Sequence, residues 1–117
     1  MQTREKLKAI YKVLDKKLAK DIKVLNIEKI SSVADYFVIA SGSSLRQVTA
    51  LEDAVNDELA KYGENPRSVE GKVSATWILM DYGDIVVNIF EPDVRQTYNL
   101  ERLWVDAKVE DMETVQA

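Results

Sequence analysis

The chain contains 117 residues, 46% of them hydrophobic and 31% charged, with 16 Lys and Arg against 20 Asp and Glu and a net charge of −4. This length has room for one domain with one hydrophobic core, and the acidic balance favours a basic protein partner over broad binding to phosphate backbones. Cysteine and histidine are both absent, so the chain can form no disulfide, thiolate metal site or Ser-His-Asp triad.

The first part of the chain predicts a helix followed by two strands. Residues 4–20 place apolar side chains at helical spacing with lysines on the remaining faces, and Thr3 is a candidate N-cap. Residues 22–28 and 35–41 are rich in β-branched and aromatic residues, which is typical of strands. The second strand is nearly all apolar, so we expect it to lie in the centre of a sheet.

The best defined element is a helix that begins after Ser44. Ser44 and Gln47 have the spacing of a capping box, and apolar residues then recur with a helical period as far as Tyr62. Gly63 stands where a left-handed residue commonly ends a helix.

Three strands are predicted next, at residues 67–70, 76–80 and 85–90. Gly83 can adopt the positive φ of a tight turn, so the last two strands should form an antiparallel hairpin. Pro92 ends the hairpin because it has no N–H to donate to a neighbouring strand.

The end of the chain carries weaker signals. A short helical turn is predicted at 99–104 and closes a domain of residues 1–104, while residues 105–117 are polar and acidic and should form a flexible tail. The element order predicts a single α/β domain, in which a mixed sheet of about five strands carries two main helices and a short C-terminal helix. The step across residues 35–70 should be a parallel crossover, and antiparallel pairs should complete the sheet.

The turn Gly42-Ser43-Ser44 allows two interpretations. Free backbone amides at the start of a helix could hold a phosphate, but a strand-to-helix turn needs a glycine and a capping serine in any case. A Gly-Ser before a helix also occurs in nucleotidyltransferases, where paired acidic residues hold magnesium. The candidates here, Asp81 and Asp84, flank a turn and need not point at one metal, so this enzyme is the alternative hypothesis.

The hairpin from Trp77 to Phe90 is the most informative stretch. Side chains alternate between the two faces of a sheet, so Trp77, Leu79 and Asp81 share one side, whereas Ile78 and Met80 share the other. One of these rows belongs to the core, and Trp77 is either a core residue or an exposed aromatic anchor beside acidic side chains. We therefore predict a partner-binding site made of Trp77, Leu79, Asp81, Tyr82, Asp84 and Asn88.

Four blocks of this sequence resemble the ribosomal silencing factor family, also called Iojap-like proteins. The blocks are residues 34–48 (ADYFVIASGSSLRQV), 69–71 (VEG), 77–90 (WILMDYGDIVVNIF) and 98–104 (YNLERLW), in the same order and spacing as in the family. One position departs from the pattern, because Asn88 stands where the family usually has histidine. An amide can form hydrogen bonds but cannot become cationic, which puts any pH-sensitive role of this position in question.

This resemblance implies a protein-binding module and no enzyme, cofactor or metal. The family resembles a degenerate nucleotidyltransferase fold that has lost its metal ligands. The resemblance further implies binding to the large ribosomal subunit through ribosomal protein L-fourteen, a steric block to association with the small subunit, and less translation under nutrient limitation. Family members can also self-associate as homodimers.

The chain also predicts a location. No apolar run approaches the roughly 20 residues of a membrane-spanning helix, and no apolar signal core follows Met1. We therefore expect a cytoplasmic protein with no membrane partner and no direct binding to DNA.

Overall fold

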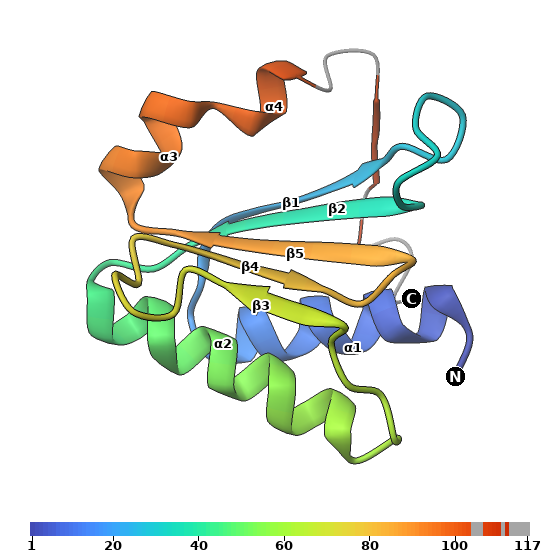
Figure 1. Ribbon diagram of the computed structural model, residues 1–117, viewed down its shortest axis with the longest axis horizontal. Coiled ribbons are helices and arrows are strands. Elements are labelled where there is room, and N and C mark those ends of the chain that lie inside the picture. The colour runs from blue at the N-terminus through green and yellow to red at the C-terminus, as the bar shows by residue number, and fades with distance from the viewer. Residues whose placement is uncertain (104–106, 111, 113–117) are drawn as a thin grey trace.

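The helices and strands of the computed structural model follow the predicted order closely (Figure 1). The structure describes residues 1–103, 107–110 and 112. Its elements are α1 (Thr3–Lys16), β1 (Lys20–Asn26), β2 (Tyr36–Ser41), α2 (Leu45–Ala60), β3 (Ser68–Glu70), β4 (Trp77–Asp81), β5 (Ile85–Phe90), α3 (Pro92–Tyr98), α4 (Leu100–Leu103) and β6 (Lys108–Val109). They form one α/β domain, which confirms the predicted fold class, with six strands in the described part of the chain where about five were expected.

The strands form a single mixed sheet in the order β3-β4-β5-β2-β1-β6. β2 pairs in parallel with β5, whereas the other neighbouring strands are antiparallel. β4 and β5 form the predicted hairpin, and Gly83 in its turn has a φ of 91°, a value that a residue without Cβ adopts without a steric clash. β3 runs in the same direction as β2, as the predicted crossover requires, but β4 and β5 lie between them.

The two faces of the sheet are covered unequally (Figure 1). α1 and α2 pack side by side across one face, and α3 and α4 lie against the other. The larger core lies under α1 and α2, and its fully buried members include Leu7, Ile10, Leu14, Val38, Val48, Leu51, Val55, Leu59, Ile78, Met80, Val87 and Ile89. A smaller cluster on the opposite face is built around Leu25, Ile27, Ile39, Val86, Phe90 and Leu100.

The start of α2 confirms the Ser44 half of the predicted capping box, whereas the Gln47 side chain bonds to the backbone of Ser43 and not to that of the N-cap residue. The Ser44 hydroxyl accepts a hydrogen bond of 3.1 Å from the backbone N–H of Gln47, and the Gln47 side chain accepts one from the backbone N–H of Ser43. The side-chain nitrogen of Gln47, Nε2, also donates to the backbone oxygens of Lys17 and Leu18, at 3.4 and 3.3 Å. This side chain therefore joins the beginning of α2 to the end of α1.

Two predicted boundaries of helices were wrong. α1 ends at Lys16, four residues before its predicted end, and Thr3 is the first helical residue and not the N-cap. Its hydroxyl donates to Asp84, a residue far away in sequence.

α3 was not predicted, because Pro92 was interpreted as a terminator of the hairpin, whereas proline is also well suited to the first turn of a helix.

The predicted flexible tail is wrong for part of its length. β6 pairs antiparallel with β1, Leu25 opposite Val109 and Asn26 opposite Lys108. Met112 is 3% exposed and belongs to the larger core. A strand of only two residues has no detectable periodicity, which is why the sequence did not indicate it. Residues 104–106, 111 and 113–117 lie outside the described part of the chain, and the domain boundary at 104 stays a prediction.

Candidate binding face of the sheet

The β4–β5 hairpin separates its side chains as the alternation predicted. Ile78 and Met80 are fully buried under α1 and α2, whereas Trp77 and Leu79 point to the other face and are half-buried. Phe37 of β2 is a third half-buried apolar side chain on that face. We call this surface, made of Phe37, Trp77, Leu79 and Asp81, the open face.

Trp77 is held in place at the edge of the open face by three neighbours. Its indole N–H donates to the Asn88 side-chain oxygen at 3.1 Å. Its ring stacks on Phe90, with 5.0 Å between ring centroids, and contacts the ring of Tyr98 at 4.9 Å. Because Tyr98 is 56% exposed, the aromatic cluster reaches the surface at α3 and can contact a partner there.

Asn88, which stands in place of the family's histidine, is fully buried opposite Leu79. Its oxygen accepts from Trp77, but its side-chain nitrogen has no hydrogen-bond partner among the described residues. An unpaired buried donor costs about 1–3 kcal/mol. Asn88 therefore orients Trp77 from within the sheet and does not itself reach the surface.

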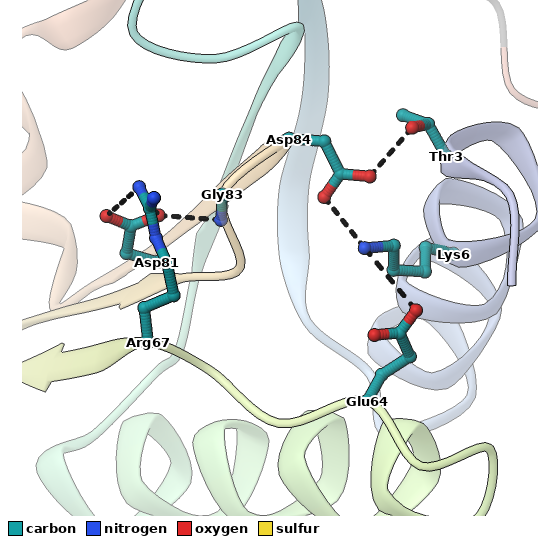
Figure 2. Close-up of polar contacts among 7 residues, drawn as sticks. All are labelled: Thr3, Lys6, Glu64, Arg67, Asp81, Gly83 and Asp84. Atoms are coloured by element: carbon teal, nitrogen blue, oxygen red, sulfur yellow. Dashed lines mark hydrogen bonds and ion pairs between the residues drawn. The ribbon is translucent and has the colours of Figure 1, made fainter.

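Asp81 lies at the rim of the open face, where the hairpin turns (Figure 2). Both of its carboxylate oxygens accept from the Arg67 guanidinium, at 3.1 and 3.3 Å, and one also accepts from the backbone N–H of Gly83 at 2.7 Å. The Arg67 side chain is 66% exposed, so this ion pair is open to solvent and contributes little to stability. Asp81 remains accessible to a charged partner.

Asp84, three residues further on, has different partners (Figure 2). Its carboxylate accepts from the Thr3 hydroxyl at 2.7 Å and from the Lys6 ammonium at 2.8 Å, and the same ammonium lies 3.6 Å from Glu64. Burial opposes the charge of Asp84, but the hydrogen bonds from Lys6 and Thr3 outweigh it and lower the pKa of the carboxyl group. Asp84 therefore fastens the start of α1 to the hairpin.

Tyr82 is on the opposite side from Trp77, since it belongs to the larger core and is only 7% exposed. Burial, followed by the negative charges of Glu52 and Glu64, raises the pKa of its hydroxyl well above the ordinary value. This hydroxyl has no hydrogen-bond partner among residues 1–103, 107–110 and 112.

The predicted site residues thus divide into two groups. Trp77, Leu79 and Asp81 lie together on the open face with Asn88 beneath them, whereas Tyr82 and Asp84 support the hairpin from the helical side. Sequence reasoning missed two contributors, Phe37 and Tyr98. Both lie in sequence blocks that carried the family resemblance, so those blocks could have indicated them.

The Gly42-Ser43-Ser44 turn is used by the fold itself. A Cβ at Gly42 would lie 2.9 Å from the backbone nitrogen of Val48, so the close approach of the two segments requires glycine here. Ser43 and Ser44 both bond to Gln47. The described residues contain no group of three or more Asp, Glu, His or Cys side chains that could hold a metal ion.

The described residues form a small single-domain α/β protein with a partly covered aromatic surface on one face of its sheet. A family model described as "Ribosomal silencing factor during starvation" matches residues 1–117. The ribosomal silencing factor of Bacillus subtilis is 42% identical over 113 residues, which cover 97% of this chain and 96% of the relative. This chain belongs to the ribosomal silencing factor family.

Two further relatives add to this assignment. A crystal structure of a Chromobacterium violaceum protein superposes with a TM-score of 0.86 at 36% identity, over 89% of this chain and 87% of that one. A mouse protein named "Mitochondrial assembly of ribosomal large subunit protein 1" is 32% identical over 96 residues, which cover 80% of this chain and 42% of the mouse protein. The expected resemblance to nucleotidyltransferases has no counterpart in these matches and stays a prediction.

No helix in the described part of the chain has the length and apolar character needed to cross a membrane.

Proposed function

We propose that this protein binds the large ribosomal subunit and prevents it from joining the small subunit. The observation that carries this proposal is the match of the ribosomal silencing factor model along the whole chain. The name of the mouse relative, which refers to large-subunit assembly, supports the choice of subunit. The site of action is the cytoplasm, and the contact on the subunit is ribosomal protein L-fourteen.

The open face is the surface that we assign to this contact. The side chains of Trp77 and Leu79 are half-buried, so a bound partner would bury the apolar surface that is still exposed. Large aromatic side chains at the centre of an interface contribute much of the binding energy. Asp81 at the rim supplies a carboxylate for steering toward a basic ribosomal protein. Asn88 and Asp84 position these groups from behind, through Trp77 and the hairpin turn respectively.

The proposed mechanism is occlusion and needs no chemical step. A patch of roughly 800 Å² on this partner is enough for a specific complex. A domain whose principal extents are 33, 31 and 27 Å then occupies space that the small subunit needs. Self-association as a homodimer is also part of this proposal, and sedimentation equilibrium of the protein alone at several concentrations tests it as a concentration-dependent mass.

Sedimentation of purified subunits with and without the protein tests this function. We expect the protein to travel with the large subunit and to reduce the fraction of joined ribosomes. Leu79→Glu and Asp81→Lys should each weaken large-subunit binding by about tenfold or more, since one buries a charge and the other places like charges together.

The matched control for Asp81→Lys is Glu28→Lys, which also replaces a carboxylate by an ammonium but at an exposed position in the β1–β2 loop. It should bind as the original chain does. If Leu79→Glu and Asp81→Lys both fold and still block joining at the original concentrations, the contact lies elsewhere. If the original chain does not bind the large subunit, the proposed function itself is wrong.

A further inference from the structure

A second surface lies on the helical side of the sheet, away from the open face. A groove of about 910 Å³ runs between α1 and α2. Its floor consists of small apolar residues from both helices, Ala9, Val13, Ala50 and Ala54. All four are exposed or half-buried, so the backbones of the two helices can be approached closely by another element.

One wall of the groove is basic. Lys8, Lys12 and Lys16 of α1 line it, all exposed and each four residues from the next. Lys17 just after α1 adds a fourth cation, and Glu5 in the first turn is, among the described residues, the one carboxylate of α1 that lines the groove. A helix rises 1.5 Å per residue, so the Cα atoms of Lys8, Lys12 and Lys16 are about 6 Å apart along the axis. Like charges at this spacing destabilise a helix.

The other wall is acidic. Asp53 and Asp57 of α2 line it and are exposed, and Glu58 and Lys61 line it as well but pair with each other at 3.2 Å. In the described residues no ion pair joins the two walls, although other lysines of the chain, such as Lys6 and Lys72, have carboxylate partners. Both rows of charge therefore remain available across a groove with an apolar floor.

We propose that this groove binds an amphipathic helix of a partner protein. The helix carries small or apolar residues on the face that meets the floor, acidic residues along the edge beside the lysine wall, and basic residues along the edge beside the aspartate wall. Helix-in-groove recognition uses this arrangement of an apolar stripe with charged flanks. α1 has 14 residues, so about four helical turns of the partner can contact the groove along its length.

Two other occupants fit the groove less well. A nucleic acid strand would gain from the lysine wall but would lie beside the repelling carboxylates of Asp53 and Asp57. A second copy of this chain would place two helices against two helices, a packing that relies on bulky apolar residues at the contact. The alanines of the floor do not provide them, and the bulky exposed apolar side chains that line the groove, Met1 and Tyr62, lie before the start of α1 and after the end of α2.

Three synthetic peptides of one length and helical pattern test the proposal. All have the same apolar stripe, but the first has glutamate on one edge and lysine on the other, the second has lysine on both edges, and the third glutamate on both. Binding to the full chain is measured by fluorescence anisotropy at low salt. We expect the mixed peptide to bind at least tenfold more tightly than either single-charge peptide, because only it pairs with both walls.

The variant Lys8→Glu, Lys12→Glu, Lys16→Glu makes both walls acidic and should reverse this preference in favour of the lysine-edged peptide. The substituted side chains are exposed, and a melting curve of the variant checks its fold. Ala54→Glu, which blocks the floor, should weaken binding of all three peptides.

Equal binding of the three peptides, or no binding of the mixed peptide, would overturn the proposal. It also fails if the chain sediments as a dimer that Ala54→Glu converts to a monomer, since the groove would then hold a second copy. None of these results depends on the ribosome, so they are independent of the proposed function.

Discussion

The two faces of the sheet are covered to different extents by helices. The face under α1 and α2 is closed, and Ile78 and Met80 are fully buried there. The opposite face is covered only in part by the short helices α3 and α4, of which α3 contributes no buried residue. Neighbouring residues of one strand therefore serve different purposes, since Met80 holds the fold together and Leu79 remains available for a contact.

The largest expected effect contrasts Met80 with Leu79. Met80→Ala should lower the free energy of unfolding by about 2–5 kcal/mol, because it leaves a cavity in the closed core. Leu79→Ala removes a half-buried side chain and should cost about 1 kcal/mol. Urea unfolding measures both, and equal losses would show that the open face is as tightly packed as the closed one.

The two carboxylates of the hairpin turn sharpen the comparison. Asp84→Asn should cost about 2–3 kcal/mol at pH 7, because the Lys6 ammonium, with 8% of its side chain exposed, loses an anionic partner. Asp81→Asn should cost at most about 1 kcal/mol, since Arg67 is open to solvent. Urea unfolding of both variants at one pH measures the two losses in unfolding free energy, and the loss should be larger for Asp84→Asn than for Asp81→Asn.

The Asp84 contribution should also depend on pH. The folded state lowers the pKa of Asp84 below its ordinary value of 3.8. The stabilisation is therefore complete above a pH of about 4 and is lost as the pH falls through the lower folded-state pKa. The gap in unfolding free energy between the original chain and Asp84→Asn should be widest at neutral pH and narrow in acid. A gap independent of pH would mean that the ion pair is not the source of the loss.

The end of the chain offers a smaller test of the closed face. Met112→Ala should cost about 2 kcal/mol, the low end for a buried methionine, because Met112 is nearly but not fully buried, with 3% of its surface exposed. Val109→Ala is the control, since Val109 is 62% exposed and its loss should change stability by less than about 0.5 kcal/mol. A neutral Met112→Ala would restore the expectation that this end of the chain does not support the fold.

The smallest effect is expected at the open rim. Arg67→Ala should change stability by less than about 1 kcal/mol, because the ion pair with Asp81 is exposed to solvent. It should also tighten binding to a basic partner by about twofold to threefold, since Asp81 loses a competing cation. Titration of the large subunit with labelled protein measures this, and weaker binding would indicate that Arg67 itself contacts the partner.

Local patterns predicted most of the fold, because periodicity, capping and turn residues act over short distances. The N-cap at Ser44, the Gly83 hairpin and the grouping of Trp77 with Leu79 were all correct. Asp84 could not be understood in this way, since its partners Thr3 and Lys6 come from the other end of the chain. From the sequence alone a carboxylate in a turn is expected to be exposed to solvent. In the folded chain, Lys6 of α1 lies beside Asp84 and partly buries it.

The same limit applied to α3 and β6. Pro92 is equally compatible with the end of a strand and the start of a helix, and the packing of Tyr98 on Trp77 decides between them. β6 exists because β1 offers an unpaired edge, a feature of the assembled sheet that residues 108–109 do not encode. The shared face of Trp77, Leu79 and Asp81 was predicted from alternation, but the placement of Tyr82 and Asp84 on the helical side required the structure.

Site-specific photocrosslinking tests the central claim that the open face docks on the large subunit. A photoreactive residue at Leu79 is compared with one at Thr49, an exposed position on α2 outside the groove. We predict that the probe at Leu79 crosslinks to ribosomal protein L-fourteen in purified large subunits and that the probe at Thr49 does not. Crosslinks to the subunit from Thr49 with none from Leu79 would contradict the account, because the helical side and not the open face would then be the docking surface.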